Sequence, residues 1–257
     1  MTLFQIGIRF WEVIAIAKPK FSAKIFYDNE PKNPRLNEVN NRIICWHDKY
    51  HLGDRHSYHS EKELLEELMK KSNIHPEETS VDMDNFESEK GKILKELKKH
   101  IPIIPLYLYD GKFPEMTCAA ERGRQQGEFV GYIFMDEEML DKLIQTSDEK
   151  RLNDAVWDML EDVDLYSNYI SGNNFLLELY KDGEHFCEVS GFTGQLNDDL
   201  LHDMEMAAGD ALTGERVSAE EVSDMFGIDA PQIIEDKERT SIPAIESVEY
   251  GEYEEEL

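Results

Sequence analysis

Several short runs of alternating apolar and polar residues predict β-strands. Residues 21–28, "FSAKIFYD", and 41–48, "NRIICWHD", are rich in β-branched and aromatic residues, and a loop containing Pro and Asn separates them. We therefore expect these two runs to pair in a small antiparallel sheet. Residues 3–17 alternate in the same way and predict another strand, in which Arg9 and Glu12 interrupt the apolar run and argue against a signal peptide.

Strands are also predicted in the second half of the chain. Residues 101–111 and 128–136 are strand-like, and the two prolines of the first run limit it to a sheet edge or to its later half. Asp182-Gly183 lies between two further strand-like runs and suits a tight turn, because both residues tolerate positive φ angles. This pattern predicts a hairpin over residues 175–190.

Capping patterns and helical spacing predict the helices. Ser60 with Glu63 precedes an apolar stripe, and Ser218 with Glu221 precedes a short helix ending near Phe226. The first stripe consists of Leu64, Leu65, Leu68 and Met69.

Four more helices are expected between these two. One contains Ile93, Leu94 and Leu97, and Asp136 can cap another that extends through Ile144. Residues 197–212 are amphipathic. Ser147 can cap a longer helix whose apolar positions are Leu152, Ala155, Val156, Met159, Leu160 and Val163.

The order of these elements favours an α+β fold with antiparallel sheets and packed helices, because strands and helices do not alternate strictly. A polar segment near 73–90 suggests a boundary. We expect a β-rich N-terminal region with one helix at 1–72 and an α+β region at 90–230. Residues 231–257 are acidic without periodicity, and we predict a flexible C-terminal tail.

The net charge of the chain limits the kinds of molecule that it can bind. The chain has 27 basic and 55 acidic residues and a net charge of −28. Such a surface is repelled by nucleic acid and by anionic membranes, so we expect neither as a direct partner and expect a basic protein instead. No stretch reaches transmembrane length. Three widely spaced cysteines form no disulfide or zinc pattern, which favours a reducing, cytoplasmic setting.

The segment "WHDKYHLGDRHSYHS" contains four of the eight histidines. His47, His51, Asp54 and His56 are candidate metal ligands, if the loop brings their nitrogen and carboxylate atoms together. The competing interpretation is structural: Asp54 would hydrogen-bond backbone N–H groups of a turn, and His56 would hold a neighbouring strand. The spacing matches no HExxH or HxH pattern, and the structural interpretation is favoured.

Other enzyme signatures are missing from the sequence. It has no GxSxG, no phosphate-binding loop and no GxGxxG. His185 and Cys187 lie on one face of a predicted strand, but no third catalytic member accompanies them. We predict a non-enzymatic protein without a cofactor.

The acidity itself has two interpretations. Carboxylates at phosphate-like spacing can mimic nucleic acid and occupy basic clefts, whereas an acidic surface can also serve solubility alone. Several aromatic residues are either interface anchors or half-buried sheet positions. They are Trp46, Tyr50, Tyr58, Tyr107, Tyr109, Tyr166 and Tyr169.

Five ordered motifs resemble a family of uncharacterised proteins encoded by phages and prophages of low-GC Gram-positive bacteria. They are "KYHLGDRHSYHS", "PLYLYDG", "GEFVGYIFM", "YSNYISGN" and "SGFTGQ". The likeness covers roughly residues 42–212. Matching positions include Tyr50, Gly53, Asp54, His56, Tyr58, Tyr109 and Asp110.

This chain departs from the family pattern after "LYLYD". Relatives continue with His-Ser-Gly, and this chain has Gly111-Lys112, so a histidine that could join His56 in a site is missing. The resemblance implies no activity, but it implies origin as a phage accessory protein acting in a bacterial cytoplasm.

Three functions remain open from the sequence. The leading hypothesis is an acidic phage protein that binds and inhibits or redirects a host protein, for example a nucleic-acid-handling or anti-phage defence component. The second is a metal-dependent hydrolase or nuclease that uses the cluster at 47–59. The third is a structural or assembly protein of the virion.

Overall fold

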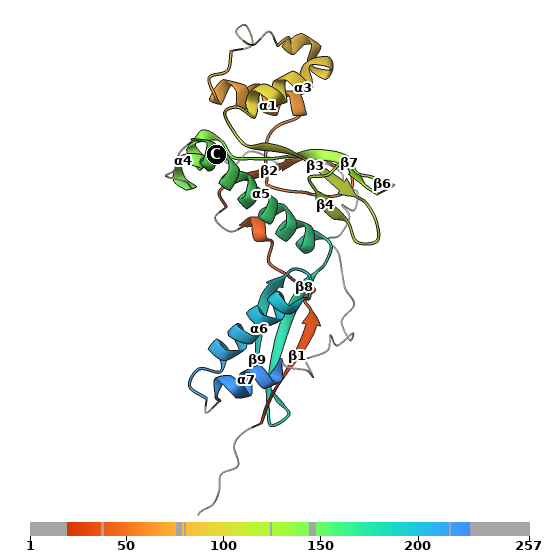
Figure 1. Cartoon of the computed structure of the whole chain (residues 1–257). Coiled ribbons are helices and arrows are strands. Elements are labelled where there is room, and N and C mark those ends of the chain that lie inside the picture. Colours follow the sequence, from red (N-terminus) through yellow and green to blue (C-terminus); the bar gives the residue numbers. More distant parts are fainter. Residues whose placement is uncertain are drawn as a thin grey trace, which may run out of the picture.

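The computed structural model describes residues 20–36, 39–75, 79, 81–123, 125–143, 148–215 and 217–226. These residues form two lobes stacked end to end (Figure 1). The large lobe consists of residues 34–170, and the small lobe consists of residues 20–28 and 174–226. Each lobe has its own sheet and its own cluster of buried apolar side chains.

The large lobe contains an antiparallel sheet in the order β2-β7-β3-β4. These strands span Arg42–Cys45, Glu128–Phe134, Ile103–Tyr109 and Glu115–Thr117. Strand β3 pairs with β7 from Ile103 onward, but β4 pairs only with Tyr107–Tyr109. The prediction from the prolines holds only in part: Pro105 lies in the half of β3 that has no β4 partner and is a local edge, but the strand starts at Ile103 and lies between β7 and β4. The small hairpin β5 (Glu121–Arg122) and β6 (Gln125–Gln126) follows β4.

Helices cover the large-lobe sheet and its end. The 3-10 helix η1 spans Pro34–Leu36, α1 spans Glu61–Lys71, η2 spans Met83–Asn85, α3 spans Phe86–Leu97 and α4 spans Glu137–Leu143. The long helix α5, Asp148–Ile170, runs across the lobe toward the junction with the small lobe (Figure 1). The Ser60 hydroxyl accepts a hydrogen bond from the Glu63 N–H, and the predicted stripe of α1 is buried. Asp136 likewise accepts from the Met139 N–H, as predicted for α4.

The small lobe has a three-stranded antiparallel sheet in the order β1-β8-β9. The strands span Phe21–Tyr27, Asn174–Lys181 and Glu184–Thr193, and they pack against α6 (Asp198–Ala211) and α7 (Ala219–Met225). Asp182 and Gly183 have φ angles of 54° and 86°, so the predicted hairpin turn is confirmed. The capping box of Ser218 and Glu221 is also present.

Two expectations about long-range organisation are wrong. Strands β1 and β2 do not pair with each other, because β1 pairs with β8 and β2 pairs with β7. A boundary near 73–90 would separate β2 from its sheet partner, so the regions 1–72 and 90–230 do not correspond to the lobes. Local pattern predicts a strand but not its partner, since partner choice depends on which pairing buries the apolar faces. The predicted strand at 3–17, Ser147 and the acidic tail at 231–257 lie outside the described residues.

Asn174 holds the two lobes together. Its side-chain N–H donates to the Tyr169 carbonyl oxygen at the end of α5 (3.0 Å), and its side-chain oxygen accepts from the Thr193 hydroxyl (2.8 Å). Its backbone carbonyl accepts from the Asp28 N–H at 2.8 Å. The side chain is 2% exposed, so these hydrogen bonds satisfy a buried amide where β1, β8, β9 and α5 meet.

The fold class predicted from the sequence, α+β with antiparallel sheets and packed helices, is confirmed. Among the described helices, none combines the length and apolar character needed to cross a membrane.

Candidate protein-binding interface

Asp54, the first candidate metal ligand, belongs to a buried ion pair. Its two carboxylate oxygens accept from Nε and Nη2 of Arg35 at 2.9 Å each. One of them also accepts from the Ile43 N–H at 2.9 Å. The Arg35 side chain is 3% exposed and also donates to the Asn41 side chain at 3.0 Å. Asp54 therefore joins η1 to the start of β2, as the structural interpretation expected of an aspartate bonded to a backbone N–H.

His56 packs among aromatic rings rather than facing the other candidates. Its ring lies 5.5 Å from that of Trp46 and 5.8 Å from that of Tyr58, measured between centroids. Its Nε2 atom lies 2.9 Å from the Cys45 carbonyl oxygen. His56 thus fastens the chain after Gly53 to the end of β2, which matches the structural expectation.

His47 and His51 have separate surroundings. The His47 Nδ1 atom accepts from the backbone N–H groups of Lys49 and Tyr50 at 3.1 Å, which forms a tight turn. His51 is exposed. The four candidate ligands thus do not converge, and the described part of the chain contains no group of three or more His, Cys, Asp or Glu residues that could hold a metal ion.

The remaining family-motif residues also support the fold. The Tyr50 hydroxyl donates to Asp110 at 2.8 Å, and the Lys49 ammonium lies 3.0 Å from both Asp110 oxygens. Hydrogen bonds from Lys49 and then Tyr50 lower the pKa of the Asp110 carboxyl. The "LYLYD" motif is therefore tied to the "KYHLGD" motif by side chains. Tyr58 and Tyr109 are half-buried.

Gly53 and Gly131 allow close approach of neighbouring strands. Gly53 has a φ angle of 72°, and a Cβ atom there would lie 2.4 Å from the Ile43 carbonyl oxygen. The Gly53 N–H donates to the buried Tyr166 hydroxyl at 2.7 Å. At Gly131 a Cβ atom would lie 2.0 Å from the Ile44 carbonyl oxygen. Both motif glycines thus have a steric reason to be glycine.

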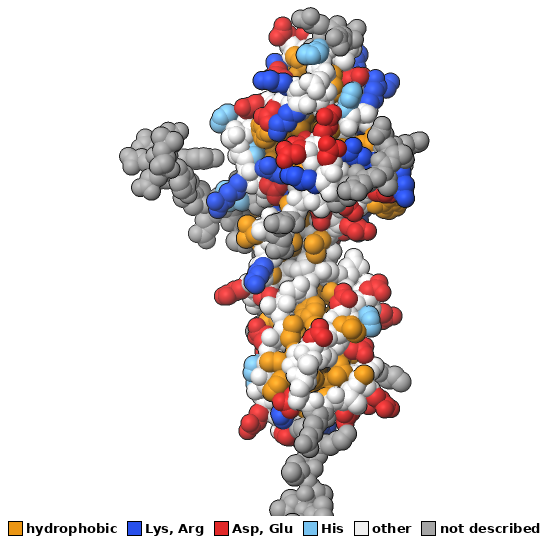
Figure 2. Space-filling view, turned by 90° about the vertical axis from the view of Figure 1, so that its left-hand side faces the viewer, with side chains coloured by type: hydrophobic (Ala, Val, Ile, Leu, Met, Phe, Trp, Pro, Cys, Tyr) orange, Lys and Arg blue, Asp and Glu red, His pale blue; other side chains and the backbone are white. Residues whose placement is uncertain are grey.

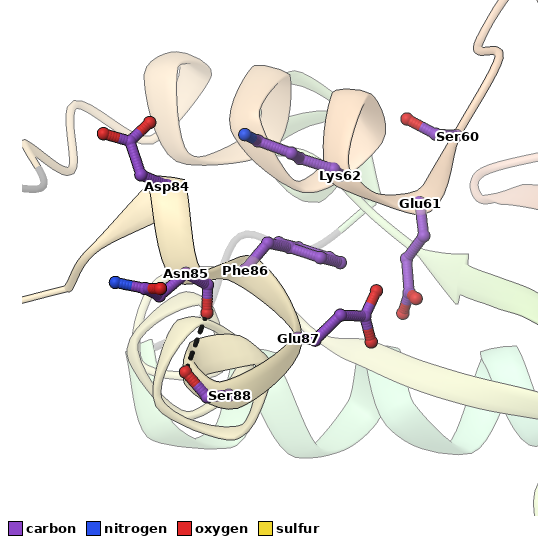
Figure 3. Close-up of a pocket in the computed structure, with 8 residues that line it drawn as sticks. All are labelled: Ser60, Glu61, Lys62, Asp84, Asn85, Phe86, Glu87 and Ser88. Atoms are coloured by element: carbon purple, nitrogen blue, oxygen red, sulfur yellow. Dashed lines mark hydrogen bonds between the residues drawn. The ribbon is translucent and has the colours of Figure 1, made fainter.

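A pocket of about 700 Å³ lies where the N-terminal ends of α1 and α3 meet (Figure 3). Glu61 and Glu87 extend toward it in Figure 3. Glu61, however, accepts from the Lys90 ammonium at 2.8 Å and from the Tyr132 hydroxyl. Burial and the Glu61 carboxylate raise the pKa of the Tyr132 hydroxyl, which keeps it a neutral donor. These groups connect α1 to α3 and to β7.

The outer face of α5 contains none of the residues that the sequence predicted for a site. Its positions Trp157, Glu161 and Asp164 follow the helical repeat and are exposed. Asp154 lies one turn before Trp157 and Asp158 follows Trp157 directly, and both lie on the same side of this row. Trp157 is 67% exposed, an unusual state for the largest apolar side chain. An exposed tryptophan surrounded by carboxylates has the composition of an interface anchor.

Carboxylates on the other large-lobe helices are mostly neutralised by lysines one turn away. Such ion pairs are Lys62–Glu66, Lys71–Glu67, Lys92–Glu89, Lys99–Glu96 and Lys142–Glu138. Within the described residues, Asp154, Asp158, Glu161 and Asp164 have no such ion pair, although Asp162 is tied to Asn41 and lies 3.7 Å from Arg35. Among the described residues, no cation pairs with these four carboxylates of the α5 face.

The pKa of Asp158 reflects its surroundings. Partial desolvation raises its pKa, and the carboxylates of Asp162 and Asp154 raise it further. Like charges four residues apart on a helix repel one another. A cationic partner would relieve this repulsion, so the charge of the α5 face favours binding of a basic surface.

The imbalance extends from α5 into the small lobe. Residues 152–226 contain 18 Asp and Glu residues and two basic residues, Lys181 and Arg216. In the view of Figure 2, Lys and Arg side chains gather on the large lobe, while the small lobe shows hydrophobic side chains bordered by Asp and Glu. Charge is thus segregated along the molecule.

None of the seven aromatic residues considered as interface anchors is exposed, whereas Trp157 is. Tyr50 and Tyr166 are buried, and the other five are half-buried. Half-buried sheet and core positions therefore explain them. Trp157 was missed, although the sequence contains a signal: it lies off the apolar stripe of the predicted helix that contains Leu152, Ala155 and Met159.

Comparisons with known proteins identify no relative: no family model, no curated protein and no solved structure matches the chain. The fold is that of an acidic α+β protein, and its helix α5 has an exposed tryptophan beside carboxylates without ion-pair partners in the described residues.

Proposed function

We propose that this chain is a phage accessory protein that binds a basic host protein through the outer face of α5, without catalysing a reaction. The observation that carries the proposal is Trp157, exposed at the centre of carboxylates that have no ion-pair partner among the described residues. The phage origin rests on the motif resemblance, and the bacterial cytoplasm is the proposed site of action.

The physical basis is electrostatic attraction followed by apolar burial. A net charge of −28 raises the association rate with a basic surface and is screened by salt. Burying Trp157 in the contact then supplies short-range affinity, as tryptophan does at interface hot spots. A host surface with this chemistry is one that normally holds nucleic acid, so the bound protein would inhibit or redirect a nucleic-acid-handling or defence component.

The metal-dependent hydrolase is not proposed, because Asp54, His56 and His47 have separate partners and His51 is exposed. No particular feature of the molecule favours a virion role. The free cysteines Cys45, Cys118 and Cys187 are compatible with a reducing compartment.

Capture from host lysate followed by competition with duplex DNA tests the proposal. The variant Asp154→Asn/Asp158→Asn/Glu161→Gln removes three charges from the α5 face. The matched control Glu66→Gln/Glu89→Gln/Glu96→Gln removes three charges from α1 and α3, where each carboxylate faces a lysine.

We expect a partner that DNA displaces, that the first variant captures at least about tenfold more weakly, and that the control captures nearly as well as the native protein. Equal capture by the native protein and the α5 variant would refute the proposal. An equal loss in both variants would also refute it, since that result would assign binding to net charge alone.

A further inference from the structure

A polar pocket of about 460 Å³ lies at the junction of the two lobes. Its wall is formed by β4, by the C-terminal end of α5 and by the segment that follows β9. The positions of these elements at the junction can be followed in Figure 1. Asp164 and Asn168 line the pocket and continue the row of Trp157 and Glu161 along α5. The pocket is therefore the end of the proposed docking face.

Two side-chain amides in the wall are held by hydrogen bonds and keep part of their oxygen lone pairs available. The Asn168 amide N–H donates to the Asp164 backbone carbonyl at 2.9 Å, and the Asn173 amide N–H donates to the Asn168 side-chain oxygen at 2.8 Å. Each bond uses one of the two N–H donors of its amide, and the amide oxygens keep lone pairs, because an amide oxygen accepts two hydrogen bonds. A ligand with several N–H donors can therefore bind these oxygens.

Asp164 supplies a carboxylate at the same place. It forms no ion pair with a described residue, and the cation in the wall, Arg122, is paired with Glu115. Asp164 also acts on its surroundings: burial and then the Asp164 carboxylate raise the pKa of the Cys118 thiol to about 11. The pocket thus combines amide oxygens with a carboxylate that has no ion-pair partner in the described part of the chain.

We propose that this pocket receives an arginine side chain of the partner that docks on α5, and this inference rests on the proposed function. A guanidinium presents five N–H donors in one plane, which can pair with Asp164 and reach the oxygens of Asn168 and Asn173 together. A lysine ammonium is a compact charge with three donors and satisfies fewer of these acceptors. The pocket volume falls in the range of small-ligand sites, so a guanidinium enters with its stem.

Calorimetric titration of the full chain with arginine and lysine homopeptides of equal length tests the inference. Both peptides have the same charge, so their long-range attraction to α5 is equal. A difference between their affinities therefore measures the contribution of the pocket. We expect the arginine peptide to bind about tenfold more tightly, the effect of one good charge-assisted hydrogen-bond set.

The variant Asp164→Asn distinguishes the contribution of the pocket from that of the rest of the α5 face. We expect it to abolish the preference for arginine while the lysine peptide binds nearly as before. The matched variant Asp158→Asn should weaken both peptides alike and keep the preference. Gln195→Ala, a second variant in the wall, should reduce the preference without changing the lysine affinity.

Two results would overturn the arginine pocket. If both peptides bind the native chain equally, or if Asp164→Asn keeps the preference, the pocket does not select arginine. The proposed function stands in that case, since the charge-dependent binding of both peptides would persist. If the α5 charge variant binds both peptides as tightly as the native chain, the docking face and the pocket fail together.

Discussion

The guanidinium of Arg35 and the carboxylate of Asp54 form a two-pronged hydrogen bond, with both N···O distances at 2.9 Å, almost completely shielded from water. Arg35 lies in the short helix η1, and Asp54 lies in the segment that gives the chain its most recognisable motif. The pair holds the loop before β2 against the loop after it. Asp54 is therefore explained by architecture rather than by metal chemistry.

We predict that Asp54→Ala destabilises the protein by about 3–5 kcal/mol, because it leaves the buried Arg35 cation without its partner. Urea denaturation followed by circular dichroism measures the loss. Asp48→Ala is the control, since Asp48 is exposed in the same segment, and we expect a change within about 0.5 kcal/mol. The double variant Arg35→Met/Asp54→Ala should recover part of the loss, and an additive loss would contradict the pairing.

The histidine segment should hold no stoichiometric metal. Elemental analysis of protein purified without a histidine tag checks this expectation, with zinc and manganese measured against protein concentration. His51→Ala should leave stability unchanged because His51 is exposed. His56→Ala should cost about 1–3 kcal/mol, since it removes a ring packed between Trp46 and Tyr58. A bound ion that disappears in His56→Ala would contradict the structural role.

Trp157 and Met159 lie two residues apart on α5 and should behave in opposite ways. Trp157→Ala removes a side chain that is 67% exposed, so the free energy of unfolding should change by less than about 0.5 kcal/mol. Met159→Ala opens a cavity in the core and should cost about 2–5 kcal/mol. Thermal or urea unfolding of both variants separates the cases. A large loss in Trp157→Ala would place this side chain in the fold instead of in an interface.

Asp158→Asn should stabilise the protein at neutral pH by a few tenths of a kcal/mol, because it removes repulsion from Asp154 and Asp162 one turn away. The folded-state pKa of Asp158 is raised, so the folded protein binds this proton more tightly than the unfolded chain. The native protein is therefore penalised above the raised pKa, and the penalty vanishes as the pH falls toward about 3.9.

Urea denaturation at several pH values tests this sign. The difference between Asp158→Asn and the native protein should shrink as the pH falls. A difference that grows toward acid pH would show that Asp158 is stabilised as a carboxylate.

Two glycines should respond oppositely to alanine. At Gly131 a Cβ atom would lie 2.0 Å from the Ile44 carbonyl oxygen, so Gly131→Ala must separate β7 from β2 and should cost at least about 3 kcal/mol. At Gly91 in α3 a Cβ atom meets nothing within 4 Å, and Gly91→Ala should stabilise the helix by about 0.5–1 kcal/mol. Chemical denaturation compares the two. Tolerance of Gly131→Ala would contradict the close approach of these strands.

Much of the local structure could be predicted from the sequence. The caps at Ser60 and Ser218 and the turn at Asp182-Gly183 depend on interactions within a few residues, and all three form as predicted. The candidate site could not be predicted in the same way. The exposure of Trp157 depends on which side of α5 meets the sheet, and the environment of Asp164 depends on segments that follow β4 and β9.

The sequence by itself determined the main helices, the longer strands, the α+β class and the negative charge, because capping, turn geometry and composition are local or additive properties. The short strands β4, β5 and β6 were not predicted. Only the tertiary structure decided that β1 joins β8, that Asp54 pairs with Arg35, and that the carboxylates of the α5 face form no ion pair with a described residue. These outcomes join residues far apart in the chain. They follow from the burial of apolar faces and the pairing of buried charges over the whole molecule, which no short pattern encodes.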